Sequence, residues 1–368
     1  MTLDDLPTPC LLLDLPALRR NLAMLRAAMA RHPGLQLRPH LKTAKSRAVA
    51  ELAAPGFAPI TVSTLAEARY FAEGGWHDQI YAVGITPQKL DAVAALNAAG
   101  GAVKVITDDA GAARAIAAHP GDLRALIEVD VGEGRGGVAP NGPALIEIAA
   151  ALGPRLAGVI SHSGHSYEGR SPAAMAAIAE AERRGILAAA ARLRAAGHAV
   201  PIVSLGSSPV AMHAESMDGV TEMRAGVYMF GDLFQAQLGT HPPEDIAVTV
   251  LASVIGRRPE RNRLLLDAGA LALSKDRSTA TAPRDYGFGL VLDRAGRPLP
   301  GEPVVARTYQ EHGEVQGTAP LPFERLPVGA RLRVAPNHAC LTAAAYDRYH
   351  VLDGGEEVVA VWDRVNGW

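Results

Sequence analysis

The sequence predicts an α/β barrel of eight parallel strands followed by an all-β domain. Between about residues 10 and 235, short β-branched runs alternate with Ala-rich helical stretches, which is the pattern of repeated βα units. After about residue 240, strand-like segments follow one another with few helical stretches between them. A chain of 368 residues suits a large barrel with a smaller companion. We therefore predict a TIM-type barrel over 10–238 and an all-β domain over 239–368, which residues 1–9 could join.

Eight apolar runs predict the barrel strands. In order they are LQLRPHLK, ITVS, IYAV, VKVIT, LRALIEVD, LAGVISH, PIVSL and MRAGVYMF. Leu18, Leu22 and Leu25 repeat at helical spacing inside 16–32, and Thr64 with Glu67 forms a capping box that opens the next helix. An active site is then expected at the C-terminal ends of the strands, where the βα loops gather.

The second half reads as β-strands. The runs DIAVTVLASVIG, NRLLLDAGALAL, PVVARTYQEHGEV and RLRVAPNHACL are strand-like, and a DGG turn at 353–355 separates RYHVL from EEVVAVW. We expect all of these segments to be extended.

The composition favours small molecules over nucleic acid or a membrane as the partners of this protein. Apolar residues make up 48% of the chain and charged residues 20%, and the net charge of −2 comes from interspersed acids and bases. No apolar run approaches the ~20 residues that cross a bilayer. The start MTLDDLPTPCLLLD lacks the features of a signal peptide, so we expect a cytoplasmic location.

His338 and Cys340 form the most informative motif, in the segment APNHACLTAA. On an extended segment, residues two apart face the same way, so both side chains could reach one metal ion. Thiolate with imidazole favours zinc, and a site with only two protein ligands would be catalytic rather than structural. The alternative is a packed histidine beside a buried cysteine.

Lys42 ends the first predicted strand and shares a face with His40. A lysine at the barrel mouth is the residue type that forms a Schiff base with an aldehyde. Gly206, Ser207 and Ser208 follow the seventh strand, where barrels often bind phosphate. Taken alone, an exposed lysine and a plain turn explain these residues better, and only their combination favours a cofactor site.

Further polar residues follow neighbouring strands. Arg135 comes after the fifth strand, His162 and Tyr167 lie in and after SHSGHSY, and Gly226 and Tyr228 lie in RAGVYMFGD. An arginine could polarise a phenolate oxygen, a tyrosine could bond a ring nitrogen, and a histidine could stack on a planar ring. Surface loop residues would look the same in the sequence.

Together these motifs resemble the alanine-racemase-like barrel enzymes that use pyridoxal phosphate. The runs LLLDAGALALSKD, QEHG, PNHAC and the terminal VNGW resemble the D-serine dehydratase family, whose relatives include D-threonine aldolases and 3-hydroxy-D-aspartate dehydratases and aldolases. The chain departs from the family pattern in having Ser-Ser in the phosphate loop and His165 before Ser-Tyr. The resemblance covers nearly the whole chain.

The resemblance implies a role for each of these residues. Lys42 would be the Schiff-base lysine, Arg135 would contact the ring hydroxyl, and Tyr167 would face the pyridine nitrogen. The implied phosphate ligands are Gly206, Ser207, Ser208 and Tyr228, with Gly226 finishing the cradle. His338 and Cys340 would bind zinc, with manganese or magnesium as the alternatives. A homodimer is also implied, as is common for this fold type.

The implied reaction is loss of water from a D-3-hydroxy amino acid, with Lys42 as the base and zinc as the Lewis acid. D-serine, D-threonine and 3-hydroxy-D-aspartate are the candidate substrates, and the products are a 2-oxo acid and ammonia. An aldolase of the same fold would break the Cα–Cβ bond instead and release glycine. A racemase needs a second base, which we do not identify. A non-catalytic pyridoxal-phosphate carrier would leave the β domain and the His-x-Cys pair unexplained.

Overall fold

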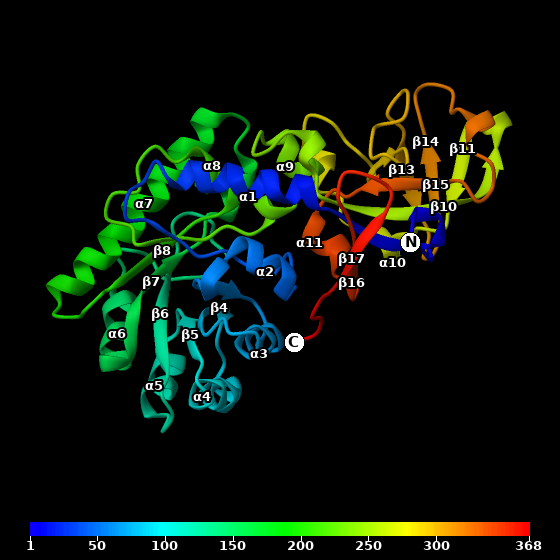
Figure 1. Cartoon of the computed structure of the whole chain (residues 1–368). Coiled ribbons are helices and arrows are strands. Elements are labelled where there is room, and N and C mark those ends of the chain that lie inside the picture. The colour runs from blue at the N-terminus through cyan, green and yellow to red at the C-terminus, as the bar shows by residue number, and fades with distance from the viewer. The chain divides into compact units, whose positions relative to one another are not determined.

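The computed structural model describes residues 1–368 and divides into two compact units (Figure 1). The barrel unit comprises Met24–Gly226 and Val365–Trp368, and the β unit comprises Met1–Ala23 and Val227–Arg364. The fold class that the sequence predicts, a parallel α/β barrel with a β domain, is confirmed.

This division differs from the predicted ranges 10–238 and 239–368 at both ends of the barrel. The first strand of the chain, Cys10–Asp14, pairs with strands of the β unit and not with the parallel sheet. At the other end, the chain leaves the barrel unit after Gly226, well before residue 238. The compact units and the predicted domains are therefore different divisions of the chain, and the predicted domain boundaries stay a prediction.

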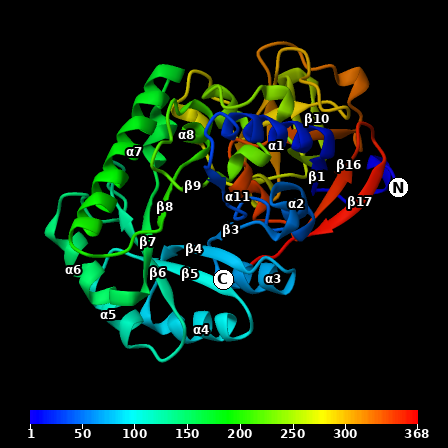
Figure 2. The same cartoon turned by 60° about the vertical axis from the view of Figure 1, so that its left-hand side comes forward.

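The barrel unit alternates strands with helices along the chain. Its strands are β2 (Gln36–Leu37), β3 (Ile60–Val62), β4 (Asp78–Gly84), β5 (Ala102–Thr107), β6 (Arg124–Val129), β7 (Leu156–Ser161), β8 (Ile202–Leu205) and β9 (Glu222–Met223). Its helices are α2 (Arg47–Ala53), α3 (Leu65–Glu73), α4 (Leu90–Ala98), α5 (Ala110–Ala118), α6 (Pro143–Leu152), α7 (Pro172–Ala195) and α8 (Ser208–His213), while α1 (Leu15–Met29) runs across the division. Figures 1 and 2 show α4, α5, α6 and α7 on the outside of the strands.

All eight strands are parallel and form one sheet in the order β2-β9-β8-β7-β6-β5-β4-β3. A bridge between His40 and Thr61 joins the two edges, since the backbone N–H of Thr61 donates to Pro39 and that of Leu41 donates to Thr61. The sheet therefore closes into a barrel. Each of the eight predicted runs overlaps one of these strands.

Local signals in the sequence explain the helix starts. The Thr64 hydroxyl accepts a hydrogen bond from the backbone N–H of Glu67 at 3.0 Å and begins α3, as its capping box predicts. The Glu67 carboxylate reaches back to the N–H of Ser63 rather than to that of Thr64. In α1, the buried Leu18, Leu22 and Leu25 form the predicted apolar stripe.

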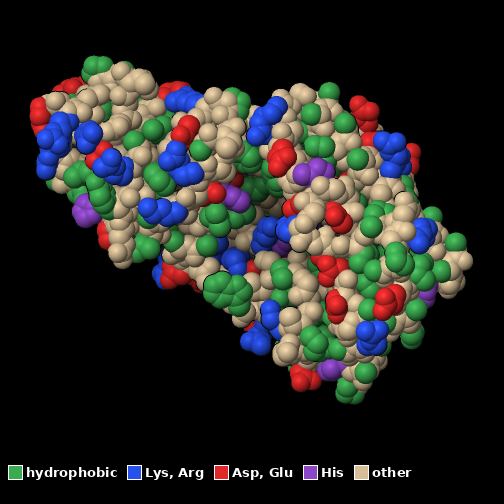
Figure 3. All heavy atoms as spheres, turned by 180° about the vertical axis from the view of Figure 1, so that it is seen from behind, with side chains coloured by type: hydrophobic (Ala, Val, Ile, Leu, Met, Phe, Trp, Pro, Cys, Tyr) green, Lys and Arg blue, Asp and Glu red, His purple; other side chains and the backbone are tan.

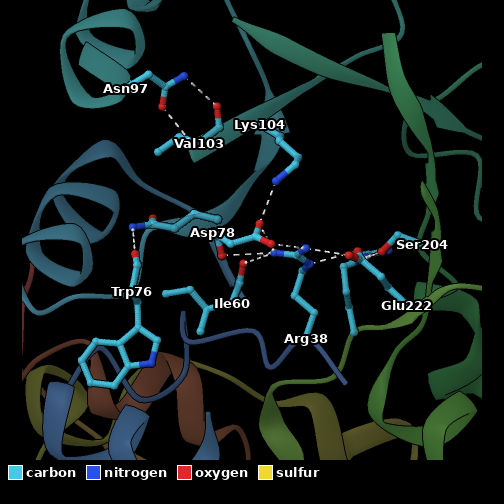
Figure 4. Close-up of polar contacts among 11 residues, drawn as sticks. Arg38, Ile60, Trp76, Asp78, Asn97, Val103, Lys104, Ser204 and Glu222 are labelled. Atoms are coloured by element: carbon cyan, nitrogen blue, oxygen red, sulfur yellow. Dashed lines mark hydrogen bonds and ion pairs between the residues drawn. The ribbon is translucent and has the colours of Figure 1, made fainter. Parts of the chain in front are cut away.

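A buried ion cluster lies at the N-terminal ends of the barrel strands (Figure 4). The guanidinium of Arg38, which is 1% exposed, donates to both carboxylate oxygens of Glu222 at 2.9 and 2.6 Å and lies 2.9 Å from Asp78. Lys104 adds a contact of 2.7 Å to Asp78. Because these side chains come from or next to β2, β4, β5 and β9, the cluster ties together strands far apart in the sequence.

The β unit is built on an antiparallel barrel. Its remaining elements are α9 (Leu233–Gln237), β10 (Val248–Arg258), β11 (Arg263–Leu266), α10 (Ala270–Leu273), β12 (Leu290–Leu292), β13 (Val304–Thr308), β14 (Gly313–Gln316), β15 (Arg331–Ala335), α11 (Ala339–Ala343), β16 (Arg348–Leu352) and β17 (Val358–Asp363). Strand β10 pairs with both β11 and β15, so the order β10-β11-β14-β13-β12-β15 closes on itself. The strand β1 (Cys10–Asp14) and the β16–β17 hairpin extend this sheet from β10.

Three segments that we predicted as extended are not wholly so. The end of NRLLLDAGALAL forms α10, and the end of RLRVAPNHACL forms α11. The run MRAGVYMF contributes only its first residue, Met223, to the strand Glu222–Met223, since Val227–Met229 forms a 3-10 turn. Apolar runs of this length fit a strand or a short helix equally well, so periodicity could not decide between them.

No helix in the structure combines the length and apolarity that a membrane-spanning segment needs. On the face drawn in Figure 3, acidic and basic side chains are interspersed rather than gathered into one large patch of either sign. That pattern agrees with the sequence, which predicts a small molecule as the partner.

Candidate active site

The barrel unit has a cleft of about 280 Å³ at the C-terminal ends of its strands. It is lined by His40, Lys42, Ser63, Ala82, Val83, Gly84, Ile106, Glu128, Arg135, Gly136, Ile160, Ser161, His162 and Arg224. Lys42, Arg135 and His162 are therefore brought together, although they lie far apart in the sequence.

Lys42 lies in the turn that follows the His40–Thr61 bridge, and its side chain is exposed to the cleft. Its backbone N–H faces Nδ1 of His40 at 3.5 Å. Burial, followed by the positive charges of Lys42 and Arg224, holds the pKa of His40 well below its usual range. His40 is therefore neutral at physiological pH and adds no charge beside the lysine.

His162 follows β7, and its Nδ1 lies 2.8 Å from the carbonyl oxygen of Gly206. Since a carbonyl can only accept, Nδ1 carries the proton and donates it. Burial lowers the pKa of His162 to about 3, although the bond to Gly206 acts in the opposite direction. The ring is a neutral, fixed wall of the cleft.

The most buried cation of the cleft is Arg224, which our reasoning from the sequence missed. It is 5% exposed, and its guanidinium donates to the Ser204 hydroxyl at 3.0 Å and to the carbonyl of Ser161. Burial lowers its pKa to about 10, against the opposing effect of Glu182, so it keeps its charge at neutral pH. The signal was a charged residue inside the apolar run MRAGVYMF, because arginine is rarely buried without a purpose.

Gly206 begins the predicted phosphate loop with a backbone that only glycine accommodates. Its φ is +129°, and a Cβ there would lie 2.5 Å from the carbonyl oxygen of Arg224. Its N–H faces Oε1 of the buried Glu182 at 3.3 Å, and the same oxygen accepts from the Ser161 hydroxyl at 2.8 Å. Glu182, a second residue that our reasoning missed, therefore ties the loop to β7.

Ser207 is the N-cap of α8, as expected for a helix start. Its hydroxyl accepts from the N–H of Val210 at 3.3 Å and lies 2.8 Å from the Ser166 hydroxyl. Ser208 is buried in the first turn of the same helix. Whether these two residues hold a phosphate stays a prediction.

The remaining predicted cofactor residues have different surroundings. A Cβ on Gly226 would lie 2.9 Å from the carbonyl oxygen of His40, so glycine lets the end of the barrel pass close to the segment that carries Lys42. Tyr167 lies in the 3-10 turn Gly164–Glu168 and does not line the cleft. Tyr228 is buried and belongs to the β unit. The roles of both tyrosines stay predictions.

In the β unit, His338 and Cys340 lie together but not on an extended segment. His338 is the extended N-cap of α11, whereas Cys340 lies in the first turn of that helix. The premise that both face one way on a strand was therefore wrong, and the helix start brings the two side chains together instead. They make a hydrogen bond that, with the negative charges of Asp232 and Asp276, outweighs burial and raises the pKa of His338 to about 9.

Asp232 and Asn337 hold the segment that carries this pair. One carboxylate oxygen of Asp232 accepts from the N–H of Ala339 at 3.0 Å, and burial raises the pKa of this acid. The Asn337 amide donates to the carbonyls of Asp276 and Gly287 at 3.1 and 2.7 Å. No set of three or more His, Cys, Asp or Glu side chains surrounds a common metal position. The pair can therefore supply two protein ligands, and other groups would complete the coordination of an ion.

Two family models match the chain. The model described as alanine racemase, N-terminal domain, matches residues 13–233, and the putative serine dehydratase domain matches residues 247–352. Together they span the barrel and most of the β unit.

Relatives of known activity match over the full length. The chain is 43% identical to D-threo-3-hydroxyaspartate dehydratase of a Delftia species, which covers 100% of this chain and 99% of that protein. It is 31% identical to D-serine dehydratase of Dictyostelium discoideum (97% and 96% covered) and 30% identical to 3-hydroxy-D-aspartate aldolase of Paracoccus denitrificans (97% and 91% covered).

Solved structures of the same dehydratase superpose closely on this chain. A histidine-to-alanine variant and a cysteine-to-alanine variant, the second described as metal-free, each have a TM-score of 0.96 at 42% identity. They cover 100% of this chain and 97% and 100% of theirs. With the matched domains, these likenesses show that the chain belongs to the D-serine dehydratase-like family of alanine-racemase-fold, pyridoxal-phosphate-dependent enzymes.

Proposed function

We propose that this protein is a pyridoxal-phosphate- and zinc-dependent lyase that removes water from a D-3-hydroxy amino acid, giving a 2-oxo acid and ammonia. The observation that carries the proposal is the contact between the His338 imidazole and the Cys340 thiol. A thiolate with an imidazole favours zinc over harder ions, and a zinc with two protein ligands leaves positions open for a substrate. D-threo-3-hydroxyaspartate is the first substrate to test, since a dehydratase for it is 43% identical over the whole chain.

The residues of the barrel cleft fit an anionic, planar cofactor. Three cations, Lys42, Arg135 and Arg224, face one carboxylate, Glu128, whose pKa is raised by burial. The two histidines of the cleft are held neutral, so the charge available for a phosphate and a phenolate comes from the lysine and the arginines. The net positive charge of the cleft therefore matches the negative charge of pyridoxal phosphate.

When bound, pyridoxal phosphate supplies an electron sink for negative charge that develops at the α-carbon of an amino acid. Lys42 Nζ would hold the cofactor and, when free, accept the α-proton of the substrate. Arg135 would hold the ring hydroxyl, and the neutral His162 ring would fix the plane of the cofactor without adding a charge. Arg224, a fixed cation with a partner on β7, would keep the cleft positive as the substrate carboxylate enters.

The chain supplies the metal with one imidazole and one thiolate. To bind an ion, the thiol must lose its proton and the histidine must be the neutral imidazole, which keeps one N–H. When bound, zinc supplies Lewis acidity toward a hydroxyl group, which favours its departure from the β-carbon. Manganese and magnesium fit this pair less well, because they prefer oxygen ligands.

An aldolase is the second candidate, supported by the relative that cleaves 3-hydroxy-D-aspartate. Such an enzyme would take the proton of the β-hydroxyl and break the Cα–Cβ bond, releasing glycine. Cys340 favours the dehydratase, because the family resemblance implies that many bacterial aldolases have an aspartate at the position of this cysteine. A carrier without activity would bind the cofactor through Lys42 and use neither His338 nor Cys340.

A homodimer and a cytoplasmic location belong to the same proposal. Neither cysteine is part of a disulfide, which suits a compartment that keeps thiols reduced. Light scattering of the purified holoenzyme would measure the number of subunits, and a mass of one chain would exclude the dimer.

Product analysis tests the function. The holoenzyme with zinc is incubated with D-threo-3-hydroxyaspartate, D-serine and D-threonine in turn. We expect ammonia and a 2-oxo acid in equal amounts from at least one of them. Release of glycine with an aldehyde would establish the aldolase. If none of the three substrates gave a product, the non-catalytic carrier would be the remaining candidate.

A further inference from the structure

The β unit has a second cavity, of about 360 Å³, that the proposed reaction does not use. Apolar side chains form much of its wall, namely Leu233, Ile246, Leu290, Leu292 and Ala335. Its polar lining includes Asp14, Thr249, Glu244, Arg297 and Arg333. This size lies near the lower limit for small-molecule pockets, so it suits a ligand of few atoms.

Arg333, on β15, is the unusual member of this lining. It is 5% exposed, its Nε is buried without a partner, and its guanidinium makes no hydrogen bond and no ion pair. Gly296, in the turn after β12, lies over it, because a Cβ there would be 3.3 Å from Nη1 of the arginine. The guanidinium is thus enclosed between that turn and the cavity.

The carboxylates around Arg333 are engaged elsewhere. Asp293 pairs with Arg297 at 2.9 Å, and Glu356 pairs with Arg294 at 2.7 Å. Asp14 accepts from the N–H of Ala17 at 2.8 Å. None of the three lies within ion-pair distance of Arg333, so their charges act on it only from farther away.

A buried cation without a hydrogen bond is costly, because burial removes its hydration and supplies nothing in return. Most buried polar groups in proteins have a partner, either protein, water or ligand. A guanidinium offers a planar pair of donors that matches a carboxylate, and bidentate pairs of this kind are strong. The apolar wall beside it would receive the rest of such a molecule.

We propose that this cavity of the β unit is a binding site for a small monocarboxylate with a branched aliphatic body, held by Arg333 and by the wall of Leu233, Leu290 and Leu292. A single buried guanidinium selects one carboxylate rather than two. The site is independent of the lyase reaction, since none of its residues belongs to the barrel cleft or to the His338–Cys340 pair.

A titration of the holoenzyme with 4-methylpentanoate tests the proposal. The protein carries labelled leucine methyl groups, and the signals of Leu290 and Leu292 report binding. Acetate, which has the headgroup alone, and 4-methylpentanamide, which has the body without the charge, are the ligand controls. We expect shifts with 4-methylpentanoate and at least about tenfold weaker binding of both controls.

Three variants separate a ligand anchor from a structural arginine. Arg333→Met should weaken 4-methylpentanoate binding at least about tenfold without lowering the unfolding temperature of the free protein, since it removes a buried, unpaired charge. Arg333→Lys keeps the charge without the planar fork and should weaken binding less. Arg348→Met, at an exposed side chain that pairs with Asp347 and does not line the cavity, is the matched control and should bind as the wild type does.

Two results would overturn the proposal. Methyl signals of Leu290 and Leu292 that stay unmoved by 4-methylpentanoate would mean that water alone fills the cavity. Equal affinity of Arg333→Met, Arg333→Lys and the wild type would mean that the arginine does not hold the carboxylate.

Discussion

The Nδ1 atom of His162 lies 2.8 Å from the carbonyl oxygen of Gly206, so the ring that walls the cleft is fixed by the first residue of the predicted phosphate loop. The same glycine faces the buried Glu182, which also binds Ser161. Two loops that would each contact a cofactor are therefore joined to one another through hydrogen bonds and cannot move independently.

His162→Phe should weaken cofactor binding while keeping a flat ring against the cleft. The phenyl ring cannot donate to Gly206, and a net hydrogen bond is worth about 0.5–1.5 kcal/mol, so we expect roughly twofold to tenfold weaker binding of pyridoxal phosphate. Titration of the cofactor by its visible absorption measures the effect. His77→Phe, at an exposed site, is the control. An equal loss of cofactor affinity in that variant would mean that the hydrogen bond of His162 does not contribute to cofactor binding.

The stability of the protein should fall as the pH is lowered below about 6.5. The pKa of His162 is about 3 in the folded protein, against ~6.5 in the unfolded chain. Between these two pH values the unfolded state binds more protons than the folded state, so lowering the pH favours unfolding. His40, whose pKa is also lowered, acts in the same direction. Each group costs at most about 1.4 kcal/mol per pH unit. Thermal unfolding between pH 7 and 5 should show a smaller decline in His162→Phe than in the wild type; parallel declines would contradict the assignment.

Lys42→Ala should abolish turnover and the visible absorption of the bound cofactor. No other lysine lines the cleft, so no neighbouring amine can take its place. Absorption spectra of the purified variant measure the result, with Lys89→Ala, a lysine that does not line the cleft, as the control. An unchanged spectrum in the Lys42 variant would place the Schiff base elsewhere.

Arg38→Met should destabilise the barrel by about 3–5 kcal/mol, because it leaves a buried carboxylate without its partner. The carboxylate of Glu222 receives its hydrogen bonds from Arg38, whereas that of Asp78 keeps Lys104. The double variant Arg38→Met/Glu222→Leu should regain most of that loss. Urea unfolding measures both, with the exposed Arg348→Met as the control. If the double variant were as unstable as the sum of its two single variants, the pair would not be coupled.

The sequence predicted the barrel well because its strands are short, β-branched and regularly spaced. It predicted less well where a segment depends on tertiary contacts. The helix α11 follows the strand β15 within one apolar run, and its first residue, Ala339, donates its backbone N–H to Asp232, which lies far away in the sequence.

The sequence predicted only part of the candidate site, because some of its residues depend on tertiary contacts. Lys42, Arg135 and His162 follow strands and share the cleft, as expected. Arg224 and Glu182 were missed because each lies inside a strand-like or helical run, where a charged residue usually points to solvent. Their burial depends on strands β7 and β8 and on helix α7 meeting in space, which a linear pattern does not record.

The most direct measurement of the central claim is ammonia release from D-threo-3-hydroxyaspartate by metal-depleted holoenzyme before and after zinc is added. We expect the depleted wild type to keep its cofactor absorption but lose most of its activity, and zinc to restore it. Cys340→Asp should keep the cofactor and gain little from zinc, because the thiolate ligand is gone. Full activity of wild-type enzyme shown by elemental analysis to hold no metal, or equal zinc-supported rates for the wild type and Cys340→Asp, would contradict the claim that His338 and Cys340 bind a catalytic metal.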